Sequence, residues 1–250
     1  MPRGTIPPMP DPLTASERPR LFLLDGMALA YRAHFAFIRS PLTNSQGVLT
    51  SAVFGFLMAL DRILEQENPE EIAVVFDPPG DTFRHERYPD YKATREKMPD
   101  EMIPQLAWIR QAVESLGIAF LSVEGFEADD VIGTLAKQGE ADGKDVWIVS
   151  GDKDMMQLVT PHVRLYNVMK PGQAEVALVG PEETVEKFGV PPEKVIDVLG
   201  LMGDSSDNVP GVPGVGPKRA LTLIEAYGDL ESVLAAAPEV KQKKLSENLQ

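Results

Sequence analysis

Four short apolar runs, each leading into acidic residues, constrain the fold more than any other feature of this sequence. They occupy residues 20–24, 71–76, 118–123 and 146–150. Near-continuous apolar runs of this length are typical of parallel strands that are covered on both faces. Helical patterns lie between them at 48–67, 103–116 and 129–140. This alternation predicts an α/β fold with a doubly wound, mostly parallel central sheet flanked by helices.

The pattern changes after about residue 180. Short helical patterns follow at 181–188, 193–202, 218–227 and 230–236, and turns rich in glycine and proline join them. We therefore predict an α/β core at 20–180 and an appended helical region at 181–250. The last ten residues carry no helix-ending signal, so we expect this region to be truncated at its C-terminus. Residues 1–19 contain six prolines and are predicted to be a disordered tail.

Composition limits the possible chemistry. The chain has 250 residues, no cysteine and a formal net charge of −14. The absence of cysteine excludes disulfides and thiolate metal sites, and it favours a reducing compartment such as the cytoplasm. No apolar run is long enough to span a membrane. The net charge argues against a nucleic-acid partner unless the acids are gathered in one place.

Nine acids stand at or near the ends of the predicted strands and in a later turn. They are Asp25, Asp77, Glu127, Asp129, Asp130, Asp152, Asp154, Asp204 and Asp207. Ligands of open α/β sheets bind beyond the carboxyl ends of the strands, so we expect these acids to converge there. Converging carboxylates repel one another, and oxygen ligands without cysteine suit Mg²⁺ or Mn²⁺. Two such ions about 3.5–4 Å apart can activate a phosphodiester. Taken singly, Asp129 or Asp130 could instead cap the helix that follows, and Asp152 or Asp154 could cap one that starts at Met155.

The segment at 81–104 mixes aromatic, basic and acidic residues. Tyr88, Tyr91, Lys92 and Arg95 recur at spacings that would place them on one face of a helix. Two prolines interrupt any continuous helix, so short helical pieces or a mobile loop are expected. Lys92 and Arg95 are candidates for stabilising charge during phosphoryl transfer. The alternative is a solvated connection of mixed charge.

The sequence GVPGVGPKRA at 211–220 is predicted to be a glycine-rich turn that enters a helix. Pro217 suits the first helical position. Backbone N–H groups at such a helix start can hold a phosphate, and Lys218 and Arg219 would add positive charge. The alternative is an ordinary turn between two helices.

Five motifs in this order carry a family resemblance: LLDGMALAYR, VVFDPPGDTFRHERYPDYKATR, EGFEADDVIGTLA, SGDKDMMQLV and LMGDSSDNVPGVPGVGPKRA. Together they resemble the 5′ nuclease domain of bacterial DNA polymerase I, which belongs to the flap endonuclease family. The resemblance implies hydrolysis of DNA phosphodiesters at 5′ flaps and 5′ ends with two Mg²⁺ or Mn²⁺ ions, as in primer removal and repair. It also implies an arch at about 83–104 through which the single strand passes. A helix-turn-helix element at 211–218, often holding K⁺, would bind the duplex.

The resemblance also assigns roles residue by residue. The nine acids match the metal ligands of the family, Tyr91, Lys92 and Arg95 match its arch, and Arg32 matches a basic position near the site. The implied DNA-binding residues are Gly211, Val212, Gly214, Gly216, Lys218 and Arg219. Implied partners are DNA with a duplex and a 5′ single strand, and a covalently linked polymerase domain. The implied location is the bacterial nucleoid. A PIN-like RNA nuclease and a non-catalytic DNA-junction module remain alternatives.

Overall fold

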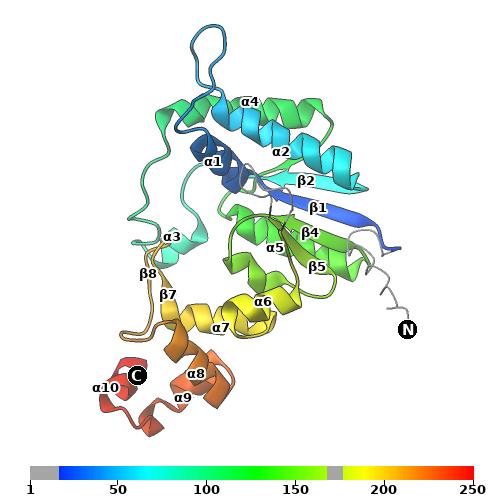
Figure 1. Ribbon diagram of the computed structural model, residues 1–250. Coiled ribbons are helices and arrows are strands. Elements are labelled where there is room, and N and C mark those ends of the chain that lie inside the picture. Colours follow the sequence, from blue (N-terminus) through cyan, green and yellow to red (C-terminus); the bar gives the residue numbers. More distant parts are fainter. Residues whose placement is uncertain (1–16, 168–176) are drawn as a thin grey trace, which may run out of the picture.

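The computed structural model describes residues 17–167 and 177–250, and a six-stranded sheet lies at its centre (Figure 1). The strand order is β3-β2-β1-β4-β5-β6, and every neighbouring pair is parallel except β5 and β6. The strands are β1 Arg20–Asp25, β2 Glu71–Val75, β3 Ala119–Leu121, β4 Asp145–Val149, β5 Val163–Asn167 and β6 Ala177–Val179. The predicted α/β fold with a mostly parallel sheet is confirmed.

The strand order reverses its direction next to β1. From β1 the chain adds β2 and then β3 on one side, and it later adds β4 and β5 on the other. Such a reversal opens a crevice at the carboxyl ends of the two central strands, which is where ligands of doubly wound sheets bind. A ligand-binding site is therefore expected at the C-terminal ends of β1 and β4.

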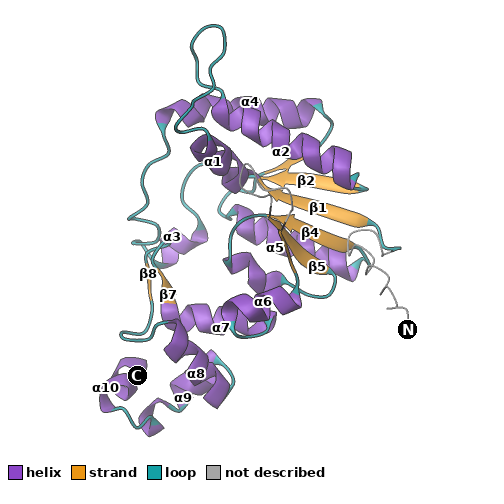
Figure 2. Ribbon diagram, viewed as in Figure 1, coloured by secondary structure: helices purple, strands orange, loops and turns teal. Residues whose placement is uncertain are grey.

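Helices cover both faces of the sheet (Figure 2). One face packs against α1 Gly26–Ala36, α2 Ser51–Glu67 and α4 Ile103–Ser115, with Phe22, Phe56 and Ile109 fully buried between the layers. The other face packs against α5 Ala128–Ala141 and the short 3₁₀ helix η2 Asp154–Leu158. Burial on both faces explains why the central strands are almost entirely apolar.

The appended helices have an apolar core of their own. They are α6 Pro181–Phe188, α7 Pro192–Met202, α8 Pro217–Tyr227, α9 Leu230–Ala235 and α10 Lys243–Leu249. Val195, Leu201 and Ile224 are buried in this second core, away from the sheet. The two-stranded pair of β7 Gly203–Asp204 and β8 Val209–Pro210 follows α7. Three smaller helical elements complete the described chain: α3 Phe83–Arg87, η1 Asp100–Met102 and η3 Ala237–Glu239.

The sequence patterns did not predict α1, β5 or β6. Helix α1 begins directly after β1, and the carboxylate of Asp25 caps it by accepting a bond from Ala28 N. The strand β5 has the sequence VRLYN, whose polar residues interrupt the apolar run, and β6 is a three-residue edge strand.

The predicted N-terminal tail falls mostly outside the described residues. At the described end of this tail, the backbone oxygen of Pro19 accepts a 3.0 Å hydrogen bond from Asp145 N, so residues near Pro19 contact β4. Within 17–167 and 177–250, no helix is both long and apolar enough to cross a membrane.

Candidate active site

Hydrogen bonds join three strand ends and the start of α5 at the point where the strand order reverses. The carboxylate of Asp25, at the end of β1, accepts bonds from Ala28 N (2.9 Å) and from Ser150 Oγ (3.0 Å), which follows β4. Asp77 follows β2, and its carboxylate accepts a 2.8 Å bond from Ala128 N at the start of α5. The first two predicted acids therefore lie at the predicted edge of the sheet.

Unfavourable electrostatics mark the centre of this edge. Burial is the main cause that raises the pKa of Asp129 to about 8, and the charges of Asp25, Asp152 and Asp77 act in the same direction. Burial likewise raises the pKa of Asp25 to about 6, against the lowering effect of its two hydrogen bonds. These four carboxylates are thus close enough to repel one another, as the sequence analysis expected.

A second set of acids links the core to the helical region. Asp152 Oδ1 accepts a 2.8 Å bond from Asp154 N. Burial, followed by the charge of Asp152, raises the pKa of Asp154 to about 7. Asp204, in β7, neighbours Asp154. Burial is the largest single effect and raises the pKa of Asp204, but the hydrogen bond from Ser206 N and the charge of Lys153, with further hydrogen bonds, together lower it. The acids that follow β4 and α7 therefore adjoin each other although they are far apart in sequence.

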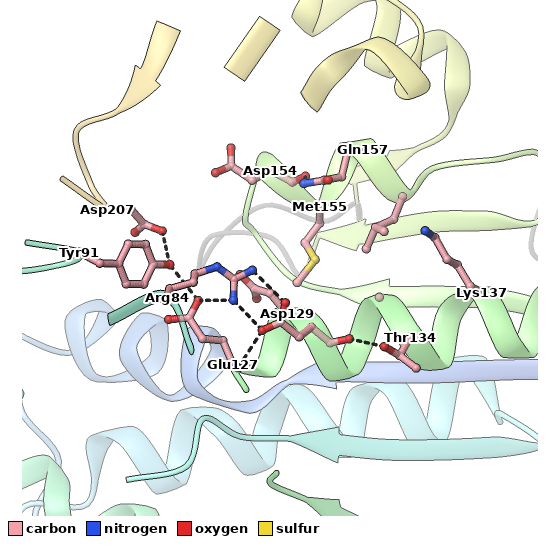
Figure 3. A pocket seen from close by; sticks show the side chains of 13 residues that line it. Arg84, Tyr91, Glu127, Asp129, Thr134, Lys137, Asp154, Met155, Gln157 and Asp207 are labelled. Carbon is pink, nitrogen blue, oxygen red and sulfur yellow. Dashed lines mark hydrogen bonds and ion pairs between the residues drawn. The ribbon is translucent and has the colours of Figure 1, made fainter. Parts of the chain in front are cut away.

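Tyr91, Lys92 and Arg95 of the predicted arch reach the acids directly, and Figure 3 shows Tyr91 beside Asp207 and Glu127. The hydroxyl of Tyr91 lies 2.9 Å from Glu127 Oε2 and 2.8 Å from Asp207 Oδ2. Burial, followed by the bond to Asp207, raises the pKa of Tyr91, so its hydroxyl stays protonated. Lys92 Nζ donates to Glu127 Oε1 at 2.6 Å, and Arg95 pairs with Asp207 Oδ1 at 2.5 Å. Glu127 and Asp207 are thereby bridged by the arch.

The arch is helical only near its ends, in α3 and η1. Lys92 has a φ of 56°, in the left-handed region, and its backbone N donates to Asp207 O at 2.9 Å. Asn208 Nδ2 donates to Asp90 O at 2.7 Å. These bonds to the 204–208 turn shape the loop, so the shared helical face suggested by the residue spacing does not form.

Arg84 is a site residue that the sequence reasoning missed. Its guanidinium makes two hydrogen bonds, of 2.7 and 2.8 Å, to the carboxylate of Asp130, and it lies 3.8 Å from Glu127 Oε2. Asp130 also accepts a 3.0 Å bond from Glu127 N, which caps α5. Asp130 therefore faces a base, unlike Asp129. The only sequence signal for Arg84 was the basic run after Asp77, which a solvated loop could equally carry.

Arg32 lies beside the turn that follows β4. Its guanidinium donates a 2.8 Å bond to Asn167 Oδ1, and a Cβ placed on Gly151 would lie 3.8 Å from the same nitrogen. Burial lowers the pKa of Arg32. The predicted basic position near the site is therefore adjacent to the Asp152 segment.

The donor chemistry of the site fits divalent cations. In the described part of the chain, no three of its acids form a ready-made metal cage. Glu127, Asp130 and Asp207 are held in ion pairs with arch bases. None of the other six forms an ion pair with an arch base among the described residues. Asp154 Oδ1 is buried without a hydrogen-bond partner in the described chain. Oxygen-only donors suit hard divalent ions.

The glycine-rich turn enters α8 as predicted. Gly216 is the N-cap, and Pro217 occupies the first turn of the helix. Val212 N donates to Leu201 O, and Val215 is buried, so the turn is anchored in the helical core. Arg219 donates a 2.7 Å bond to Gly214 O, which fixes the turn from the helix side. Binding of DNA by these residues stays a prediction.

Gly211, a predicted DNA-binding residue, has a structural requirement of its own. A Cβ there would lie 2.1 Å from the backbone of Met202 and 2.5 Å from Gly203 N, because β7 and β8 approach closely. We expect Gly211→Ala to lower the free energy of unfolding by about 3 kcal/mol or more. Gly216→Ala is the matched control, since no atom lies within 4 Å of its Cβ position. Urea unfolding of both variants measures the difference, and equal stability would contradict the close approach.

Family models for 5′-3′ exonucleases match most of the chain. The model described as the N-terminal resolvase-like domain matches residues 20–189. The model described as the C-terminal SAM fold matches residues 190–250.

Curated relatives and solved structures agree with this match. DNA polymerase I of Bacillus subtilis is 46% identical over 235 residues, which are 94% of this chain and 26% of the relative. DNA polymerase I of Rhizobium leguminosarum is 46% identical over 237 residues, covering 92% of this chain and 23% of the relative. The chain thus spans about a quarter of the length of these relatives.

Two solved structures share the fold at lower identity. The T5 5′-exonuclease with bound zinc has a TM-score of 0.75 and 23% identity, over 92% of this chain and 83% of that chain. The catalytic core of Rad2 in complex with DNA substrate has a TM-score of 0.58 and 17% identity, over 95% and 71% of the two chains. Because the two family models together match residues 20–250 and curated relatives reach 46% identity over more than nine-tenths of the chain, this chain belongs to the 5′-3′ exonuclease family.

Proposed function

We propose that this chain hydrolyses DNA phosphodiester bonds at 5′ flaps and 5′ ends with the help of two divalent cations, Mg²⁺ or Mn²⁺. One observation carries the proposal. Carboxylates from five separate segments meet at the strand-order reversal, where bases of the arch pair with Glu127 and Asp207. An acid cluster beside cationic side chains suits a reaction on a phosphodiester.

The cations would bind between the carboxylates that repel one another. Asp25, Asp77, Asp129 and Asp152 would hold one ion, and Asp154 and Asp204 would contribute to the second. Glu127 and Asp207 would become metal ligands after Lys92 and Arg95 move from them to the substrate. Asp130 is paired with Arg84, so it would act only through its neighbouring residues. When bound, the ions would polarise the phosphodiester and neutralise its charge.

The residues of the chain itself would position the substrate and stabilise charge. Lys92 Nζ and the guanidinium of Arg95 already lie at the acids, so a short movement would carry them to a phosphate oxygen. Tyr91 is buried and offers a protonated hydroxyl at the same place. Arg32, beside the Asp152 segment, would attract the substrate backbone. The single 5′ strand would pass through the arch at about 83–104.

The helical region would hold the duplex. The turn from Gly211 to Gly216, with Lys218 and Arg219, would act as a helix-turn-helix grip on the phosphate backbone, with K⁺ at the turn. The relatives are about four times longer, so we further propose that a polymerase domain is joined to this nuclease. The reaction would then take place on the bacterial nucleoid, in the cytoplasm.

A cleavage assay tests this proposal. A labelled duplex with a 5′ flap should be cut near the junction in Mg²⁺ and left intact in EDTA. A matched RNA flap should be cut much more slowly, because the proposed substrate is DNA. Efficient cutting of the RNA flap would favour the PIN-like alternative, and binding of the DNA junction without turnover would favour a non-catalytic module.

Lys218→Ala should weaken duplex binding without impairing chemistry. Removing one phosphate contact should lower affinity for all duplex sequences alike and reduce the slope of log affinity against log salt by about 0.9. The single-turnover rate at saturating enzyme should stay close to wild type. Titrations over a salt series in Ca²⁺, beside rates in Mg²⁺, measure both quantities. Unchanged affinity and slope would make the turn a simple helix connection.

A further inference from the structure

Helices α8 and α10 lie at the foot of the molecule in Figure 1. Two adjacent grooves are lined by residues of α8 and of the turn before it on one side and by residues 240–248 on the other. The first has a volume of about 590 Å³, and its lining includes Lys218, Thr222 and Lys241. The second has a volume of about 400 Å³, and its lining includes Lys244 and Asn248. Arg219 and Gln242 line both grooves, which therefore form one continuous surface.

This surface is cationic in a strongly acidic protein. Four bases line the two grooves, namely Lys218, Arg219, Lys241 and Lys244, and no Asp or Glu lines either one. All four side chains are exposed, and in the described chain none of them forms an ion pair. The net charge of the whole chain is −14, so the positive charge of this patch is opposite in sign to that of the protein as a whole. It is suited to a polyanion.

The two walls of the surface are fixed relative to each other. Asn248 Nδ2 donates a 2.7 Å bond to Pro213 O, and Arg219 donates a 2.7 Å bond to Gly214 O, so both walls meet at the glycine turn. Leu245 is buried in the helical core and anchors the C-terminal wall. The bases therefore project from a rigid support, which reduces the entropy lost on binding.

We propose that residues 241–248 form a second wall of the duplex-binding site, which extends the grip beyond the glycine turn. One DNA phosphate would lie between Arg219 and Lys244, and another between Lys218 and Lys241. The side-chain amide of Gln242 would supply a neutral hydrogen-bond donor. Contacts of this kind fix the position of the backbone and read no bases, so binding would be independent of sequence. The proposal rests on the duplex-binding function proposed above.

The test compares three lysines of one segment. Lys241→Ala and Lys244→Ala should each lower affinity for a duplex of arbitrary sequence about three- to tenfold and reduce the salt slope by about 0.9. Lys243→Ala is the matched control, because its side chain is 92% exposed, pairs with Glu247 at 3.9 Å and lines neither groove. It should change affinity less than about twofold. Lys244→Arg should retain affinity, since it keeps the charge.

Two results would overturn the proposal: unchanged binding by Lys241→Ala and Lys244→Ala, or equal losses in all three alanine variants, which would indicate diffuse charge. Cleavage of a 5′ flap by the wild type is measured in parallel. If Lys244→Ala lowers duplex affinity but the wild type never cuts a flap, the proposed nuclease activity is refuted and the proposed duplex-binding surface is supported. Melting temperatures equal to wild type confirm that the exposed substitutions leave the fold intact.

Discussion

Asp129→Asn should abolish cleavage and at the same time stabilise the metal-free protein. The single-turnover rate on a 5′-flap duplex in Mg²⁺ should fall by at least about 10³-fold, which is the loss expected when a ligand of a catalytic ion is removed. The melting temperature in EDTA at pH 8 should rise by about 5–10 °C, because one of several crowded charges disappears. Loss of activity with a gain of stability is the signature of a site built for a cation.

The pH dependence of stability gives an independent check. The pKa of Asp129 rises from 3.8 to about 8 on folding, so folding favours its protonated form. In metal-free buffer the free energy of unfolding should therefore fall as the pH rises from about 4 to about 8. The Asn variant should lack this part of the decline, as measured by urea unfolding at several pH values.

The control for Asp129→Asn is Asp61→Asn, which removes an exposed carboxylate from α2. It should leave the cleavage rate and the melting temperature near those of the wild type. Cleavage by Asp129→Asn within about tenfold of wild type would remove Asp129 from the site. An unchanged melting temperature in EDTA would argue against the repulsion among Asp25, Asp129 and Asp152.

Lys92→Ala should lower the single-turnover rate by about 10²–10³-fold, the scale of losing one preorganised donor to transition-state charge. Its ammonium lies 2.6 Å from Glu127 Oε1, and the left-handed backbone and the bond to Asp207 O hold it there. Affinity for plain duplex should change less than about threefold, because the arch meets the single strand. Rates at saturating enzyme and titrations in Ca²⁺ separate the two effects.

Lys97→Ala is the matched control for Lys92→Ala. Lys97 is an exposed lysine of the same arch and forms no ion pair in the described chain. It should keep a rate within a few-fold of wild type. If both variants lost rate equally, the arch would act through its overall charge, and if Lys92→Ala lost rate and duplex affinity in parallel, Lys92 would be a binding residue.

Local patterns in the sequence were sufficient to predict the fold class and most of the helices. Strands β1, β2 and β4 are buried on both faces over most of their length, so their composition alone distinguishes them. The fourth apolar run forms β3, a three-residue edge strand that is exposed or half-buried. Helix α6 has the bounds that its first-position proline, Pro181, and its following glycine, Gly189, indicate. Strand β5 was missed because its interrupted pattern, VRLYN, takes its strand conformation from pairing with β4 and β6.

The sequence also determined which acids to consider, because their place after parallel strands implies a common edge. Only the tertiary structure decided which carboxylate meets which partner. Tyr91 reaches Asp207 across 116 residues of sequence, and Arg84 reaches Asp130 across 46. Asp129 and Asp130 are neighbours in the chain, yet one meets acids and the other meets a base, because successive residues of a helix point in different directions. Charge repulsion and ion pairing depend on distance in space, and no local pattern encodes it.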